Sequence, residues 1–209
     1  MVKVMRQGIS EVSMKRYAII LLLVACQLLS AGAGHGEEPA VRTASGEFAI
    51  LGGYGITHRG FGATRTQVET VDAILRYGHF LSGELGTGRW FQGRHELLVE
   101  VPLHLTLDPR VRTMTGGYLL GSWKFTSLEG LAPYVFAGGG VLYNDLGLDT
   151  QGTRLNFSYQ GGTGLQWFVR PDTALGIEYR YHHVSNAGTA EPNEPLNSSK
   201  FLLGVSVYR

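Results

Sequence analysis

The sequence predicts an all-β protein, an eight-stranded antiparallel transmembrane β-barrel of the outer-membrane type that comes after a cleaved signal peptide. Three observations predict it. An export signal opens the chain of 209 residues, segments of about ten or more residues with alternating polarity fill most of the remaining sequence, and Gly, Pro, Asp and Asn separate these segments. The segments number eight, and an even number suits the closure of an antiparallel barrel.

The export signal occupies residues 1–33. Lys15 and Arg16 form its basic start, an apolar run covers residues 18–29, and an A-G-A cleavage site ends it. Cleavage and lipidation at Cys26 is an alternative, which we rank second because the apolar run continues past this residue. Cys26 is the only cysteine, so cleavage after residue 33 leaves a mature chain without a disulfide or a thiolate metal site.

Residues 34–46 are small and polar, and we expect a short periplasmic lead-in without structure. The barrel then spans residues 47–209. Its expected strands are 47–57, 66–80, 93–107, 114–125, 131–143, 155–169, 173–185 and 198–208. With both termini in the periplasm, the connections 126–130 and 170–172 are short enough for periplasmic turns, whereas 81–92 is longer than expected.

The polarity of the alternation predicts that the apolar side faces lipid. In the third segment one face carries only aliphatic residues, and the other carries mostly polar ones, including two glutamates and His104. A soluble barrel of the lipocalin type is the alternative, and it would need its apolar side inward. The formal net charge of +1 with scattered Lys and Arg gives no sign of a nucleic-acid partner.

Two polar residues, His183 and Ser185, end the outward face of the segment 173–185. Residues two apart on a strand have Cα atoms roughly 6 to 7 Å apart, which lets an imidazole approach a hydroxyl proton as a base. The alternative is that both simply end a strand. The topology places them near the outer leaflet, which in a Gram-negative envelope consists of lipopolysaccharide.

Neighbouring residues suggest the rest of an acyl-transfer site. An oxyanion hole is expected from the side-chain amide of Asn186 together with the backbone N–H groups of Ala187 and Gly188, although a simple turn after the strand explains the same triplet. Tyr179 and Tyr181 share the outward face, where they would bind substrate along an acyl-chain track. Ordinary lipid-facing aromatic residues are the alternative.

The stretch HVSNAG (183–188) and the stretch PNEPLN (192–197) after it resemble the signature of the lipid A 3-O-deacylase (PagL) family, whose members are eight-stranded outer-membrane barrels. The resemblance implies Ser185 as nucleophile, His183 as general base and Asn186 as an oxyanion donor. It implies lipid A of lipopolysaccharide as the partner and substrate, with release of a 3-hydroxy fatty acid in the cell outer membrane. It calls for no cofactor and no metal.

Two positions depart from the family pattern. Asn197 stands where the family has an orienting glutamate, so Asn197 is expected to orient His183, with Glu194 as the fallback. Pro195 replaces a glycine of the family. A degenerate deacylase and a non-catalytic small barrel with a structural or surface-binding role remain alternatives, and the oligomeric state stays open, with a homodimer among the choices.

Overall fold

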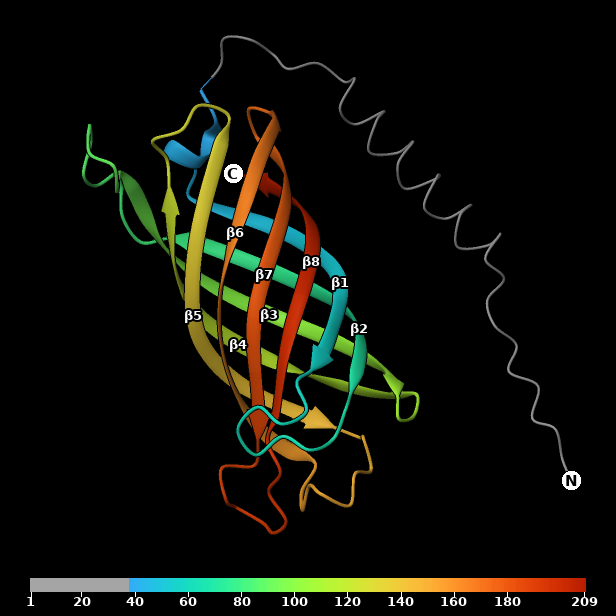
Figure 1. Cartoon of the computed structure of the whole chain (residues 1–209). Coiled ribbons are helices and arrows are strands. Elements are labelled where there is room, and N and C mark those ends of the chain that lie inside the picture. Colours follow the sequence, from blue (N-terminus) through green and yellow to red (C-terminus); the bar gives the residue numbers. More distant parts are fainter. Residues whose placement is uncertain (1–37) are drawn as a thin grey trace, which may run out of the picture.

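The computed structural model describes residues 38–209, and they form one closed barrel of antiparallel strands in which β1 also pairs with β8 (Figure 1). The strands are β1 (Gly46–Thr57), β2 (Glu69–Phe80), β3 (Gly93–Asp108), β4 (Arg112–Phe125), β5 (Leu131–Asn144), β6 (Leu155–Arg170), β7 (Thr173–Ser185) and β8 (Leu196–Tyr208). The predicted fold class is confirmed. The largest boundary difference is at β2, which was expected from residue 66. The predicted signal peptide, 1–33, lies outside the described residues and stays a prediction.

The two faces of the barrel wall have opposite chemistry. Outward-facing Ile50 and Leu203 are 65% and 67% exposed, whereas the charged side chains of Lys124, Arg180 and Lys200 lie fully buried in the lumen. A strand that exposes its aliphatic side and buries its charges is stable when the exposed side contacts lipid. The expectation of an apolar outer face is therefore confirmed.

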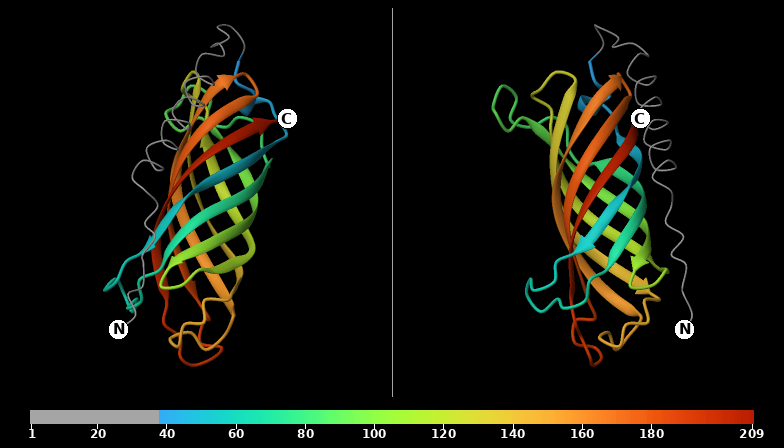
Figure 2. Two further views of the ribbon diagram at one scale, coloured as in Figure 1. Left: turned by 90° about the vertical axis from the view of Figure 1, so that its right-hand side faces the viewer. Right: turned by 45° about the vertical axis from the view of Figure 1, so that its right-hand side comes forward.

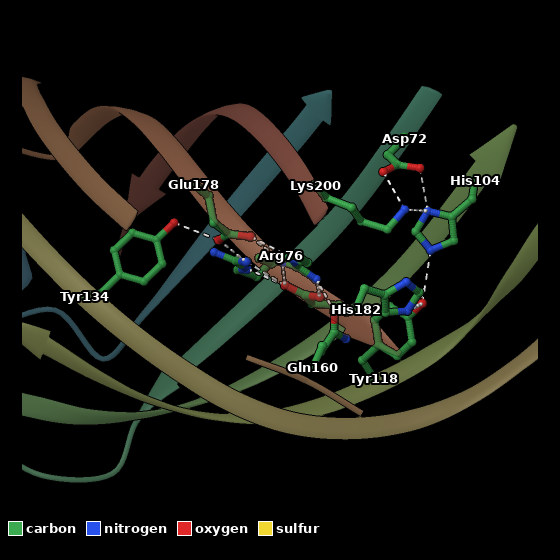
Figure 3. Close-up of polar contacts among 11 residues, drawn as sticks. Asp72, Arg76, His104, Tyr118, Tyr134, Gln160, Glu178, His182 and Lys200 are labelled. Carbon is green, nitrogen blue, oxygen red and sulfur yellow. Dashed lines mark hydrogen bonds and ion pairs between the residues drawn. The ribbon is translucent and has the colours of Figure 1, made fainter. Parts of the chain in front are cut away.

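Paired charges fill the lumen (Figure 3). Arg76 bonds Glu178 at 2.6 Å, and Arg180 bonds Glu100 at 2.8 Å. Towards the other end, Asp72 accepts hydrogen bonds from a lysine and a histidine at 2.7 Å each. Charges removed from water need such partners, because an unpaired buried charge is strongly destabilising.

The lead-in covers one end of the barrel. A 3-10 turn, η1 (Ala40–Arg42), buries Val41, whose exposed fraction is 3%. Arg94 of β3 donates hydrogen bonds of 2.9 Å to the carbonyls of Val41 and Ala44, and the Ala40 N–H donates to Pro171 at 2.7 Å. The expectation of no structure is wrong for this part of the lead-in, because the buried guanidinium of Arg94 holds its backbone in place.

Both ends of the described chain lie at the η1 end of the barrel (Figures 1 and 2). The connections 58–68, 109–111, 145–154 and 186–195 lie at the opposite end. Among residues 38–209, no helix has the length and apolar character needed to cross a membrane. The predicted site lies beside the loops at this opposite end, because β7 ends there.

Candidate active site

His183 and Ser185 lie at the end of β7 on the outward face of the barrel wall. The residues that alternate with them, His182 and Val184, are each 2% exposed, and His182 Nε2 lies 3.0 Å from the Tyr118 hydroxyl inside the lumen. Because successive side chains of a strand point to opposite faces, the predicted pair points away from the lumen. Both side chains are partly exposed, so a molecule outside the barrel can reach them.

Strand pairing builds the surroundings of His183. Its partner on β8 is Asn197 and its partner on β6 is Tyr159. The imidazole Nε2 lies 3.1 Å from Ser185 Oγ, and Nδ1 lies 2.7 Å from Asn197 Oδ1. The Tyr181 hydroxyl donates to the same Oδ1 at 2.6 Å, and the Tyr159 ring stacks on the imidazole with centroids 4.2 Å apart.

This geometry has the form of a nucleophile, a base and an orienting group. A hydroxyl is a weak nucleophile unless a base accepts its proton and a third group holds that base in position. Hydrogen bonds to Asn197 and Ser185 and the stacked ring of Tyr159 together fix the orientation of the His183 imidazole. Within residues 38–209, no cluster of three or more His, Cys, Asp or Glu is arranged to hold a metal ion.

Tyr179 and Tyr181, predicted to bind substrate, have different surroundings. Tyr179 is 39% exposed, its ring lies 5.1 Å from the Phe201 ring, and its hydroxyl lies 2.9 Å from Ser199 Oγ. The Tyr181 hydroxyl is occupied by Asn197, so this residue supports the orienting group directly. Contact of either tyrosine with substrate stays a prediction.

A family model described as "Lipid A 3-O-deacylase (PagL)" matches residues 74–206, which include every member of the site on β6, β7 and β8. The chain belongs to this family. Among solved structures, it is similar to the outer membrane enzyme PagL, with a TM-score of 0.53 and 17% identity over 77% of this chain and 98% of that chain. It is also similar to Neisserial surface protein A (NspA), with a TM-score of 0.58 and 14% identity over 79% and 98%. No curated protein sequence matches. The predicted family and the predicted outer-membrane location are confirmed.

The structure shows which of the two candidate orienting residues, Asn197 or Glu194, contacts His183. Asn197 occupies Nδ1 of His183, and Ser185 occupies Nε2, so no ring nitrogen is left for Glu194. The Glu194 carboxylate instead accepts the backbone N–H groups of Arg65 and Thr66 at 2.8 and 2.6 Å. The fallback assignment of Glu194 is therefore corrected: this carboxylate ties the loop 186–195 to the loop 58–68.

The electrostatics of Glu194 agree with this structural role. Burial acts to raise the pKa of its carboxyl, but the hydrogen bonds from Arg65 and Thr66, together with the positive charge of Arg65, outweigh burial and hold the pKa below its usual value. Glu194 is therefore ionised at neutral pH and accepts both bonds as a carboxylate.

Two of the three predicted oxyanion donors are occupied within their own loop. The Asn186 amide donates to the carbonyls of Ala190 and Pro192 at 2.7 and 3.3 Å, and the Gly188 N–H donates to Asn186 Oδ1 at 2.9 Å. Asn186 therefore shapes the loop, which corrects the expectation that its amide points at the reaction. Ala187 takes a left-handed φ of 53°, and within residues 38–209 its N–H has no hydrogen-bond partner.

Sequence reasoning missed Tyr159, Thr64 and Asn193. Tyr159 lies within the expected strand 155–169, and the pairing of β6 with β7 places it opposite His183. Asn193 Oδ1 accepts a hydrogen bond of 2.9 Å from the Asn186 backbone N–H. Thr64 lies in a loop before the matched region and contacts Asn197 at 2.9 Å. No periodic pattern indicates a loop contact of this kind.

Proposed function

We propose that this PagL-family protein is an outer-membrane serine esterase that removes the 3-O-linked 3-hydroxyacyl chain from lipid A. One observation carries the proposal: an unbroken hydrogen-bonded series from Asn197 through His183 to Ser185 lies on the outside of the barrel wall. Ser185 is the nucleophile, His183 the general base and Asn197 the orienting residue. Family membership supports the substrate class.

The reaction can be written from these positions. Ser185 Oγ attacks the ester carbonyl carbon while its proton passes to His183 Nε2. The carbonyl oxygen becomes negative and accepts a hydrogen bond from the Ala187 N–H. Collapse of this intermediate breaks the bond to the sugar O3, which takes the proton from His183. Water then attacks the acyl-enzyme with His183 as base, releasing the 3-hydroxy fatty acid and regenerating Ser185.

The route of the substrate is set by the outward orientation of the site. Outer-membrane barrels have short periplasmic turns and longer external loops. Both ends of the described chain lie opposite the site, so periplasmic termini put the site at the depth of the outer leaflet. Lipid A reaches Ser185 by lateral diffusion, and its acyl chain lies along the face of Tyr179 and Phe201. A homodimer stays a prediction, as does the absence of a cofactor.

Mass spectrometry of lipid A from cells that express the protein tests the proposal. Expression of the natural sequence is expected to lower the lipid A mass by one 3-hydroxyacyl group. Ser185→Ala and His183→Ala are expected to abolish this loss while the barrel still assembles, as judged by heat-modifiable electrophoretic mobility. No mass loss with the natural sequence, or the same loss with Ser185→Ala, would remove the proposal in favour of a non-catalytic barrel.

Ser158→Ala is the matched control. Ser158 of β6 pairs with Val184, the residue of β7 that lies between His183 and Ser185, but the Ser158 side chain is buried on the lumen side. It is therefore as close to the site in the sheet as a serine can be without facing substrate. Deacylation by Ser158→Ala is expected to equal that of the natural sequence.

A further inference from the structure

The hydroxyl of Thr64, in the β1–β2 loop, lies directly behind the orienting residue. Thr64 is 1% exposed. Its Oγ1 donates to the Pro195 carbonyl at 2.9 Å and accepts from Asn197 Nδ2 at 2.9 Å and from the Asn197 backbone N–H at 3.1 Å. One loop residue therefore contacts both the side chain and the backbone of Asn197.

The single proton of this hydroxyl decides which way it can act. The Pro195 carbonyl is only an acceptor, so the Thr64 proton points to it, and Oγ1 can only accept from Asn197. A second pure acceptor, the Phe61 carbonyl, lies 3.3 Å from Asn197 Nδ2. The nitrogen end of the amide thus faces two acceptors, and its oxygen end must face His183.

The orientation of the amide sets the tautomer of the imidazole. With Asn197 Oδ1 at 2.7 Å, His183 Nδ1 carries the proton, and Nε2 keeps a lone pair towards Ser185. A reversed amide would donate to Nδ1 and put the proton on Nε2, which could no longer accept the serine proton. In a serine protease triad, stabilising the wrong tautomer by an aspartate-to-asparagine change lowers turnover about 10⁴-fold.

An orienting carboxylate has two equivalent acceptor oxygens and needs no such control, whereas an amide has one useful end. We propose that Thr64 is a positioning residue that fixes the amide of Asn197 and, through it, the tautomer of His183. This inference rests on the proposed esterase function. It also explains physically how an amide serves in this chain at a position where the family has an acid.

Thr64→Val removes the hydroxyl at nearly constant shape, and Thr64→Ser retains it. Losing one hydrogen bond that biases the amide is expected to lower kcat about tenfold in Thr64→Val, with KM within a factor of about two because Thr64 is buried away from lipid. Thr64→Ser is expected to restore kcat to within about threefold. Equal kcat in Thr64→Val and the natural sequence, or equal losses in both variants, would overturn the inference.

A double-mutant cycle with Asn197→Ala tests whether Thr64 acts through Asn197. Without the amide, Thr64 has no side chain to orient, so Thr64→Val is expected to cause no further loss of kcat in the Asn197→Ala background. A loss as large as in the natural background would mean that Thr64 acts by another route.

The tautomer itself is measurable without any activity. In protein with ¹⁵N-labelled histidine, the side-chain nitrogen shifts of neutral His183 are expected to show the proton on Nδ1, and the Nε2–H form is expected to gain population in Thr64→Val. An Nε2–H form in the natural sequence overturns the inference even if every variant fails to fold. Failure of the proposed function would appear separately, as unchanged lipid A, and would leave this measurement readable.

Discussion

Replacing Arg180 by Met tests the account of the lumen. The guanidinium donates to Glu100 at 2.8 and 3.1 Å, to Gln160 at 2.7 Å and to Glu178 at 2.9 Å, and its side chain is 1% exposed. Arg180→Met leaves two buried carboxylates to share Arg76. Removing one member of a buried ionic group costs about 3–5 kcal/mol, because the remaining charge stays out of water without its partner. The measurement is the free energy of unfolding in urea, followed by tryptophan fluorescence in lipid vesicles.

The double variant Arg180→Met with Glu100→Gln is the control. It leaves Arg76 paired with Glu178, so the buried group is neutral again, and most of the lost stability is expected to return. A loss below about 1 kcal/mol for the single variant, or an equal loss for the double variant, would refute the reasoning, since exposed pairs contribute only that much. Deacylation by the folded fraction is expected to be unchanged, because this group faces the lumen.

Three other predictions concern local contacts. Because folding lowers the pKa of Glu194, the ionised carboxylate stabilises the contact between the loops 58–68 and 186–195 above the unfolded pKa of about 4.3, and this stabilisation is lost as the pH falls through the folded pKa. Limited proteolysis is therefore expected to cut these loops only in acid. Glu194→Gln is expected to remove this dependence on pH. Gly164→Ala is expected to lower the free energy of unfolding by about 1–3 kcal/mol because the new methyl group would overlap the Tyr134 ring. Gly121→Ala, with its nearest atom 4.0 Å away, is expected to leave it unchanged. Asn186→Ala is expected to lower kcat at least tenfold while the urea midpoint of the barrel stays the same, because its amide holds only the loop.

The barrel could be predicted because every strand of its wall shows the same alternation of outward and inward side chains. Alternation with period two sets which side chains contact lipid, and it is enough to place His183 and Ser185 on one outward face. The same rule failed at the lead-in. Val41 has no periodic neighbours, and its burial depends on Arg94, which is far away along the sequence.

The candidate site was predictable where it lies on strands and not where it lies on loops. Asn197 was suggested by resemblance, and its pairing with His183 is set by the register of β7 and β8. The Asn186 amide donates to carbonyls in its own loop, and no sequence pattern predicts the path of that loop. The expectation of an oxyanion donor at Asn186 could therefore not be corrected from the sequence. Thr64 is far from the motif that it supports along the sequence, and only the closure of β1 on β8 brings the two together.

The filled lumen has a consequence for the rate of the proposed reaction. Because charged side chains occupy the interior, nothing arrives at Ser185 through the barrel, and its reactant must already be dissolved in the surrounding leaflet. Turnover then depends on the mole fraction of that lipid in two dimensions rather than on its amount per volume of buffer. Adding inert phospholipid to vesicles should slow the reaction even when the total quantity of lipid A in the tube is constant.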